Sequence, residues 1–276
     1  MSSLLAISDL HIGFGPNREH VQQLRPRHDD DWLLVAGDVA DHVEQIMWAM
    51  RLLAGRFAKV IWAPGNHELW TPPRDSVQLK GVARYEHLVG LLRGLGVVTP
   101  EDPYPVWPGP DGGLTIAPLF VLYDYSFLPP EAANKSEALA LAHARGTVCT
   151  DEILLYPDPY PSIDAWCEAR VSYTESRLAA RDPSLPTILI NHYPLVREPT
   201  LVLRHPEFAI WCGTERTRDW HLRFNAACVV YGHLHIPRST VYDGVPFEEV
   251  SVGYPREWEQ RGPAPRPRPR LIAPGR

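Results

Sequence analysis

The chain of 276 residues is 45% hydrophobic and 22% charged, which is typical of a folded globular protein and excludes a disordered or fibrous chain. Its formal net charge is −6, yet residues 261–276 hold arginines and no acid, so residues 1–260 are more acidic still and poorly suited to nucleic acid. No apolar run approaches the roughly 20 residues that cross a bilayer, the N-terminus lacks a basic signal segment, and the cysteines form no C-x-x-C pair. We therefore expect a cytoplasmic protein with reduced thiols and no membrane partner.

Short apolar runs alternate with amphipathic stretches through the first third of the chain. The runs predict strands at Leu4–Ser8, Trp32–Ala36 and Val60–Ala63. Apolar residues at three- and four-residue spacing predict helices at His42–Phe57 and Tyr85–Leu95. Strands that alternate with helices predict βαβ units and a largely parallel sheet.

A further strand is predicted at Leu114–Leu122, after which the pattern changes. Residues 129–184 combine several prolines, an alanine-rich stretch and a helical pattern from Ile163 to Arg181. We interpret residues 129–184 as a helical insertion that lies near the functional site.

The strand pattern then resumes, with strands predicted at Thr187–Asn191, Cys228–Tyr231, Ser239–Tyr242 and Phe247–Val252. Asp243-Gly244 separates the last two strands and favours a hairpin turn. We expect one domain over residues 1–260, followed by a disordered, Arg/Pro-rich tail over residues 261–276.

Five short polar blocks each follow a predicted strand: D-L-H at 9–11, G-D at 37–38, G-N-H-E at 65–68, N-H at 191–192 and G-H-L-H at 232–235. Ligands collect at the carboxyl ends of strands in an open α/β sheet. Residues two apart in extended backbone face the same way, so we expect Asp9 and His11 to point together, and likewise His233 and His235. Glycines before Asp38, Asn66 and His233 permit sharp turns.

The blocks supply carboxylates, imidazoles and one amide oxygen, from Asp9, Asp38, His11, His192, His233, His235 and Asn66. Nitrogen and oxygen ligands without thiolate favour manganese, iron or zinc over calcium. This set is too large for one tetrahedral zinc, whereas two metals that share a carboxylate would use every ligand. A lone histidine at a strand end is usually structural, but the ordered set of blocks favours a metal site.

These blocks resemble the calcineurin-like metallophosphoesterases, whose pattern reads D-x-H, G-D-x-x-D, G-N-H-[DE], a strand-end histidine and G-H-x-H. The residues around the blocks, such as A-P-G-N-H-E-L-W and Y-G-H-L-H-I-P, are similar to an actinobacterial-type bacterial branch. The resemblance implies an α/β fold, a four-layer α/β/β/α sandwich, and in-line attack of a metal-bridging hydroxide on a phosphate ester.

Carried over residue by residue, the resemblance implies one metal held by Asp9, His11, His235 and a bridging Asp38. The second metal would be held by Asp38, Asn66, His192 and His233.

The resemblance also implies that His67 protonates the leaving oxygen or holds a phosphoryl oxygen, and that Asp41 orients this histidine. The alternative for Asp41 is an N-cap of the helix predicted at His42–Phe57.

The substrate is expected to be a phosphate ester, with a diester favoured, because some members of the branch remove 4′-phosphopantetheine from acyl carrier proteins. Carrier proteins are acidic, so a local basic patch would have to attract them, and the tail could supply one. The alternatives are a small-nucleotide phosphodiesterase or phosphatase, and a catalytically silent scaffold with the same fold. A nuclease is disfavoured by the acidic charge.

Some residues near the blocks allow both a substrate-binding and a structural interpretation. The aromatic candidates are Tyr123, Tyr125, Trp211, Trp220, Tyr254 and Trp258. The cationic candidates are Arg197, Arg238 and Arg256. For most of them, core packing or a solvated surface role is the simpler expectation.

Overall fold

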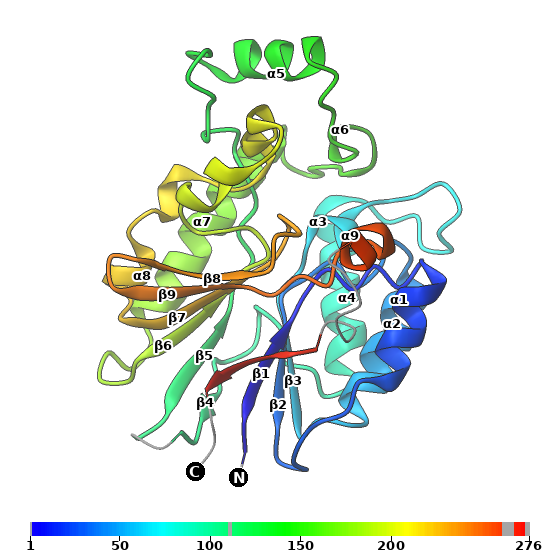
Figure 1. Cartoon of the computed structure of the whole chain (residues 1–276), viewed down its shortest axis with the longest axis vertical. Helices are drawn as coiled ribbons and strands as arrows, with labels where there is room; N and C mark the ends of the chain where they lie inside the picture. The colour runs from blue at the N-terminus through cyan, green and yellow to red at the C-terminus, as the bar shows by residue number, and fades with distance from the viewer. Residues whose placement is uncertain (1, 110–111, 261–267, 274–276) are drawn as a thin grey trace.

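Two β-sheets form the centre of the molecule (Figure 1). The computed structural model describes residues 2–109, 112–260 and 268–273. The smaller sheet has the order β10-β1-β2-β3 and contains β1 (Leu4–Ile7), β2 (Trp32–Val35), β3 (Lys59–Trp62) and β10 (Arg270–Ala273). The larger sheet has the order β4-β5-β6-β7-β9-β8 and contains β4 (Val106–Trp107), β5 (Leu114–Pro118), β6 (Thr187–Ile190), β7 (Ala226–Tyr231), β8 (Arg238–Tyr242) and β9 (Val245–Glu249).

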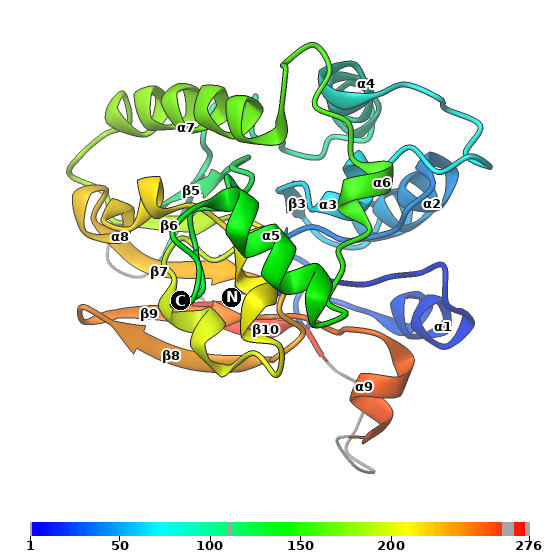
Figure 2. The same cartoon turned by 90° about the horizontal axis from the view of Figure 1, so that it is seen from above.

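Helices cover the outer face of each sheet (Figure 2). The smaller sheet is covered by α1 (Gly15–Gln23), α2 (Val43–Ala54) and α4 (Gly81–Arg93). The larger sheet is covered by α7 (Ile163–Ala179) and α8 (Trp220–Arg223). The short elements are α3 (Asn66–Leu69), α5 (Lys135–Ala144), α6 (Asp151–Leu154), α9 (Pro255–Gln260) and the 3-10 helices η1 (Glu198–Val202), η2 (Pro206–Trp211) and η3 (Glu215–Thr217).

Alternating side chains of the strands build two different cores. Leu4 and Ala6 of β1 face the second sheet and pack in a cluster with Ile188 of β6. Leu5 and Ile7 face the other way and join the larger cluster that includes the buried side of the helices. Strands that are buried on both faces have continuous apolar sequences, which is why these runs are visible in the sequence. The predicted α/β fold, a four-layer α/β/β/α sandwich, is confirmed.

Most predicted elements are present with shifted ends. The helices predicted at His42–Phe57 and Tyr85–Leu95 are α2 and α4, and α4 begins earlier, at Gly81. The strand predicted at Leu114–Leu122 is too long, because β5 ends at Pro118. Beyond Pro118, the backbone amide and carbonyl of Val121 bond to the side chain of Asn191 instead of to a neighbouring strand.

The C-terminal segment contradicts part of the prediction. The composition predicts disorder over residues 261–276, but Arg270–Ala273 form β10 and pair antiparallel with β1. The Arg270 guanidinium also lies 2.6 Å from the Glu248 carboxylate of β9. An apolar strand that covers the otherwise open edge of β1 satisfies backbone groups there. Residues 261–267 and 274–276 lie outside the described residues.

The predicted hairpin turn is confirmed. Tyr242 of β8 pairs with Val245 of β9, and only Asp243 and Gly244 connect them. Both turn residues have positive φ, 50° and 81°, as a type I′ turn requires.

The segment 129–184 divides into parts with different positions. Its last helix, α7, is a regular member of the outer layer, and Trp166 and Cys167 pack in the large core. Helix α5 stands at the top of the molecule, above the edge where the strands end (Figure 1). Within the described ranges, every helix is too short or too polar to span a membrane.

Candidate metal centre

The five polar blocks meet at one edge of the two sheets. Asp9 and His11 follow β1, Asp38 follows β2, and Asn66 and His67 begin α3 directly after β3. On the second sheet, His192 follows β6, and His233 and His235 follow β7. The side chains of Asp9, His11, Asp38, Asn66 and His192 are at most 4% exposed. The site therefore draws its donors from both sheets.

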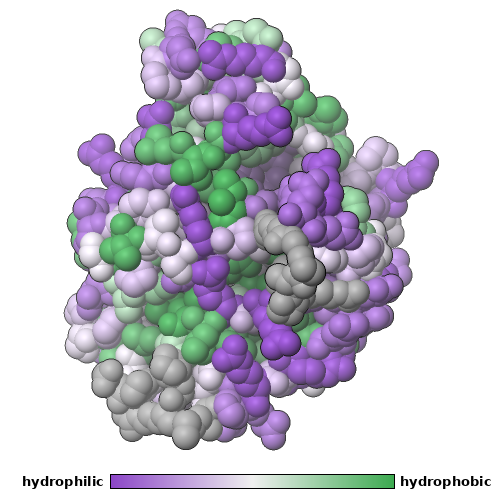
Figure 3. Space-filling model, in the orientation of Figure 1, coloured by the Kyte–Doolittle hydropathy of each residue, from purple (hydrophilic) through white to green (hydrophobic). Residues whose placement is uncertain are grey.

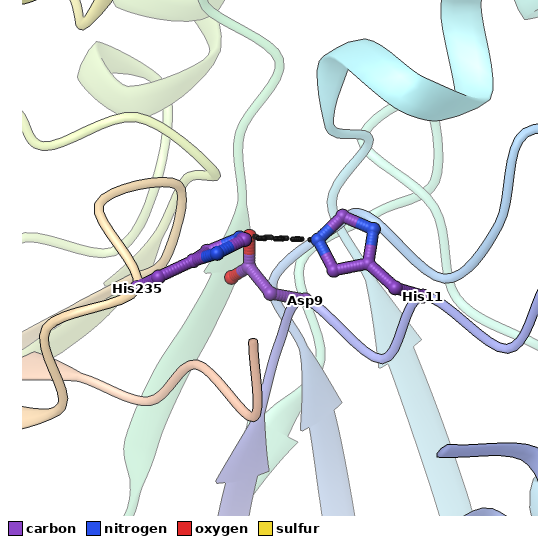
Figure 4. Close-up of side chains that lie close together, drawn as sticks. All are labelled: Asp9, His11 and His235. Atoms are coloured by element: carbon purple, nitrogen blue, oxygen red, sulfur yellow. Dashed lines mark hydrogen bonds and ion pairs between the residues drawn. The ribbon is translucent and has the colours of Figure 1, made fainter. Parts of the chain in front are cut away.

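Asp9, His11 and His235 form the first group of donors (Figure 4). The Nε2 atoms of His11 and His235 lie 3.0 Å apart, and His235 Nε2 lies 3.1 Å from Asp9 Oδ1. The far nitrogen of His235, Nδ1, contacts Glu257 Oε2 at 2.7 Å. The hydroxyl of Ser251 donates to Asp9 Oδ2 at 2.7 Å. These outer contacts fix which atoms face the centre.

Asp38, Asn66, His192 and His233 form the second group. His192 Nε2 lies 3.3 Å from Asp38 Oδ2, 3.1 Å from Asn66 Oδ1 and 3.2 Å from His233 Nδ1. Asp38 also belongs to a cluster with His11 and His67, so its carboxylate lies between the two groups. This position is the one expected of a bridging ligand.

The second group needs a positive charge at its centre. The Ala36 carbonyl can only accept, so the 2.8 Å contact from His192 Nδ1 places a proton on Nδ1. A neutral His192 then presents a lone pair at Nε2 to the oxygens of Asp38 and Asn66, which are also acceptors. Burial opposes protonation of His192, but the Asp38 carboxylate raises its pKa to about 10. A cation, either a proton or a metal, must offset this cluster of acceptors.

The first group of donors likewise favours a positive charge at its centre. Burial would lower the pKa of His235, but the carboxylates of Asp9 and Glu257 raise it to about 10. By contrast, burial and the neighbouring His192 lower the pKa of His233 to about 3, which leaves a neutral imidazole. Carboxylates, an amide oxygen and imidazoles without thiolate suit manganese, iron or zinc. The residues present therefore fit a metal centre.

The backbone that aims these side chains differs from our expectation. Asp9, His11, His233 and His235 are not in extended backbone, because their φ angles are 53°, 40°, 69° and 54°. Non-glycine residues adopt this left-handed region at a cost of about 1–3 kcal/mol each. The side chains converge because four strained turns point them at one place, and not because they alternate along a strand.

Two of the glycines are required because a side chain at their positions would clash, and not because their φ is positive. A Cβ at Gly65 would lie 2.1 Å from Asp38 Oδ1, and one at Gly232 would lie 2.2 Å from Asp9 Oδ2. Only a residue without a side chain lets the backbone approach these carboxylates so closely. Gly37 combines both effects, since its φ is 83° and its Cβ would meet the Gly65 backbone at 2.5 Å.

His67 lies beside the donor groups and contacts Asp41. His67 Nδ1 is 2.7 Å from Asp41 Oδ1, and its Nε2 is 3.7 Å from Asp38 Oδ2. Burial opposes protonation, but the carboxylates of Asp38 and Asp41 raise the pKa of His67. The helix-cap alternative for Asp41 is wrong, because α2 has His42 at its N-cap without a side-chain cap bond. The Val43 amide donates instead to Asp75.

Sequence reasoning missed three acids that support the site. Glu257 holds His235, as described above. Asp151 accepts hydrogen bonds from Asn66 Nδ2 at 2.9 Å and Trp70 Nε1 at 2.6 Å. Glu68 accepts from the backbone amides of Asp38, Val39 and Gly65 at 2.7–3.0 Å and so joins the turns after β2 and β3. Glu68 was visible inside G-N-H-E, but no local pattern marks the other two.

Two cavities open beside the donor groups. The main cavity, of about 680 Å³, reaches Asp38, Asn66, His67, His233 and His235 and is walled by residues 146–150 and by Leu203, Arg204, His205 and Phe208. The side cavity, of about 660 Å³, reaches His11, His67 and Asp41 and is walled by Phe14, Pro255 and Glu259. In Figure 3 the surface is hollowed between the part that carries α5 and the side that carries α9.

The aromatic and arginine candidates near the polar blocks fall into two groups, those that line the cavities and those that are held elsewhere. Tyr254 and Arg256 line both cavities, and the Tyr254 ring stacks on His11 at 4.4 Å. Trp211, Trp220, Tyr123 and Tyr125 are buried in the large core, and Trp258 packs against it and donates to Asn17. Arg197 and Arg238 donate to the backbone carbonyls of Leu128 and Pro199.

Comparison with known proteins shows strong similarity to a phosphodiesterase in both sequence and structure. The chain is 58% identical over 261 residues, 95% of its length and 81% of the relative's, to the acyl-carrier-protein phosphodiesterase PptH of Mycobacterium tuberculosis. The crystal structure of phosphopantetheinyl hydrolase PptH from the same organism matches with a TM-score of 0.95 and 56% identity, covering 99% of this chain and 97% of that one. TT1561 of Thermus thermophilus, with a TM-score of 0.50, 13% identity and coverage of 91% and 88%, shares the fold alone.

A family model described as calcineurin-like phosphoesterase matches residues 2–237. That span contains all five polar blocks and both groups of donors. The resemblance read from the motifs is thereby confirmed, and the chain belongs to the calcineurin-like phosphoesterase family, hydrolases that act on phosphoric ester bonds.

Proposed function

We propose that the chain is a phosphodiesterase that releases 4′-phosphopantetheine from the serine of an acyl carrier protein. The observation that carries this proposal is the 58% identity to the acyl-carrier-protein phosphodiesterase PptH across 95% of the chain. The convergence of every expected donor at one edge of the sheets supports it and disfavours a silent scaffold. The main cavity supports a substrate larger than inorganic phosphate.

The reaction adds water across the phosphorus–oxygen bond to serine. The hydroxide oxygen forms a bond to phosphorus, the bond from phosphorus to the serine oxygen breaks, and a proton goes to that oxygen. The products are 4′-phosphopantetheine and a carrier protein with a free serine. Each atom of water is accounted for, and no oxidant or further reactant is needed.

We assign one metal, of manganese, iron or zinc, to Asp9, His11, His235 and Asp38. The second is assigned to Asp38, Asn66, His192 and His233. Two such ions, when bound, supply positive charge for the phosphoryl oxygens and make water acidic enough to provide hydroxide at neutral pH.

His67 is assigned as the proton donor to the serine oxygen. Asp41 accepts from Nδ1–H, and the carboxylates of Asp38 and Asp41 raise the pKa of His67 although burial opposes this, so the ring is held as an imidazolium whose Nε2 also carries a proton to give away. Asp41 thereby favours the cationic form of the ring and holds it in the orientation that the transfer requires. The Trp70 ring lies 3.7 Å from the His67 ring, centroid to centroid, and fixes its plane.

Basic residues lie close to the site although the chain as a whole is acidic. Arg204 and Arg256 line the main cavity, whereas the chain as a whole carries −6. An acidic carrier protein would be attracted to these guanidinium groups although the remaining surface repels it.

The test is incubation of the manganese-reconstituted protein with a holo-carrier protein, followed by intact-mass analysis. We expect loss of the phosphopantetheine mass from the carrier and no loss with Asp38→Asn. Cyclic nucleotides and dinucleotides, assayed in parallel, test the small-nucleotide alternative. Hydrolysis of nucleotides without release of phosphopantetheine would contradict the proposal.

A further inference from the structure

Two serine hydroxyls hold the Asp9 carboxylate from the side away from the other donors. Ser8 Oγ donates to Asp9 Oδ2 at 2.6 Å, and Ser251 Oγ donates to the same oxygen at 2.7 Å. The other oxygen, Oδ1, lies 3.1 Å from His235 Nε2 in the first group of donors (Figure 4). Both serines are at most 2% exposed, so bulk water does not compete for these bonds. The orientation of the Asp9 carboxylate therefore depends on the two hydroxyls.

A buried glutamate lies on the other side of Ser251. Glu249, the last residue of β9, is 0% exposed, and its Oε1 lies 2.5 Å from Ser251 Oγ. Its Oε2 accepts from the Ser251 amide at 3.2 Å, and its Oε1 accepts from the Ile236 amide at 3.3 Å. Ile236 directly follows the donor His235. One carboxyl group thus joins the end of β9 to the turn that carries His235 and to the hydroxyl that holds Asp9.

The hydroxyl of Ser251 has one proton for two carboxyl groups. Asp9 Oδ2 and Glu249 Oε1 both lie within hydrogen-bond distance of Ser251 Oγ, and a hydroxyl donates only once. Two ionised carboxylates would leave one of these contacts as oxygen against oxygen with no proton between them. A proton on Glu249 completes both bonds, because Glu249 then donates to Ser251. Asp9 is not the protonated partner, because a metal ligand has to be the carboxylate.

The surroundings of Glu249 agree with this proton count. Within the residues that the structure describes, no lysine, arginine or histidine forms an ion pair with Glu249, and a buried charge without such a partner is costly. Burial, together with the neighbouring charge of Asp9, raises the pKa of Glu249 to about 7. A neutral carboxyl group is therefore the form that fits the position.

We propose that Glu249 and Ser251 are positioning residues of the first donor group, in which Glu249 donates a hydrogen bond to Ser251 and Ser251 donates to Asp9. This inference rests on the assignment of Asp9 as a metal ligand under the proposed function. Neither residue is among the donors or the described walls of the two cavities, so both act on the metal through Asp9 and the turn at His235.

The test is titration of the metal-free protein with manganese by calorimetry, followed by elemental analysis after gel filtration. Ser251→Ala removes the link to Asp9 and should weaken the binding of one of the two ions by about 10–100-fold, the usual cost of losing such an outer contact. The other ion, in the second donor group, should bind as in the wild type. A folding defect would weaken both ions, so the selective loss identifies a positioning role.

Glu249→Gln tests the form in which the carboxyl group acts. The glutamine NH₂ can donate to Ser251 Oγ as a neutral carboxyl group does, and its oxygen can accept from the Ser251 amide. Manganese affinity should therefore stay within about threefold of the wild type, since only the weak bond from the Ile236 amide is lost. Glu249→Ala has no donor and should lose affinity as Ser251→Ala does. If Glu249→Ala does not fold, Ser251→Ala and Glu249→Gln decide the matter.

Glu248 provides the matched control. It is the neighbouring residue of β9, so its side chain lies on the opposite face of the strand, where it contacts Ser239 and Arg270. Glu248→Ala should bind both manganese ions as the wild type does. A loss of manganese in Glu248→Ala equal to that in Ser251→Ala would contradict a specific role for the buried pair.

Three further results would overturn the inference. Wild-type affinity in Ser251→Ala would exclude a positioning role, and equal weakening of both ions would exclude an action through Asp9. Equal losses in Glu249→Gln and Ser251→Ala would exclude Glu249 as a hydrogen-bond donor. The proposed function fails in a different way, namely if the wild-type protein does not release 4′-phosphopantetheine from a holo-carrier protein, whatever the variants bind.

Discussion

The Asp151 carboxylate accepts a hydrogen bond from Asn66 Nδ2 at 2.9 Å, although the two residues are 85 positions apart. This contact turns the amide of Asn66 so that its oxygen, and not its nitrogen, faces His192. Asp151 begins α6 in the segment 129–184, so that segment is joined directly to the second donor group. The same carboxylate holds Trp70, whose ring lies 3.7 Å from the His67 ring, centroid to centroid.

Asp151→Ala should weaken the second metal-binding site. Without its acceptor, the Asn66 amide is free to rotate and present NH₂ to the metal, and loss of such outer contacts typically costs about 10–100-fold in metal affinity. Manganese titration by calorimetry measures this. Glu152→Ala, at the exposed neighbouring position, is the control and should bind manganese as the wild type does. Identical affinities in both variants would exclude a positioning role for Asp151.

Asp38→Asn should abolish activity and reduce metal content more than Asn66→Ala. The Asp38 carboxylate lies between both donor groups and carries charge, whereas the Asn66 amide is a neutral donor in one group. Elemental analysis after reconstitution in excess manganese should give two ions for the wild type. It should give fewer for Asp38→Asn than for Asn66→Ala. A wild type that binds only one ion would contradict the two-metal assignment.

His67→Ala should keep its metals but lose turnover in a way that depends on the leaving group. Proton donation contributes about 10²–10⁴-fold and matters most for a basic alkoxide, so an alkyl diester should lose more rate than a nitrophenyl diester. Asp41→Asn should show the same dependence at smaller amplitude, since it acts on the His67 ring. His143→Ala, at a 48% exposed side chain, is the control. Equal losses on both esters would indicate that His67 positions phosphate instead.

Asp31→Asn should destabilise the fold at neutral pH by about 1.5–3 kcal/mol, the range for hydrogen bonds to a charged group. The buried Asp31 carboxylate accepts from the amides of Ser3, Arg27 and His28, and although burial opposes this, these bonds lower its pKa. A depressed pKa stabilises the fold above the unfolded value of about 3.9, and this contribution disappears as the pH falls through the folded value.

Urea unfolding at several pH values measures this difference. The gap between wild type and Asp31→Asn should close in acid, and the exposed Asp30→Asn should show no gap at neutral pH. A gap of constant size down to acid pH would mean that the charge of Asp31 is not the cause.

The sequence by itself determined the layers and the donor set. Strands such as Leu4–Ile7 are buried on both faces, so their apolar runs are continuous and visible without a structure. The donors each follow such a strand, and parallel strands bring their carboxyl ends to one edge. The Asp243-Gly244 dipeptide also predicted the hairpin turn, because few residues adopt positive φ readily.

Only the tertiary structure decided how the donors are aimed and what supports them. Our expectation of extended backbone at Asp9 and His11 was wrong because both residues occupy left-handed turns, which the surrounding packing enforces against local preference. Glu257 and Asp151 act across long separations in the chain, on His235 and Asn66, and no local pattern marks such acids. The strand at Arg270–Ala273 likewise exists because the edge of β1 is there to pair with it, and a free edge is a property of the folded sheet and not of the tail's own composition.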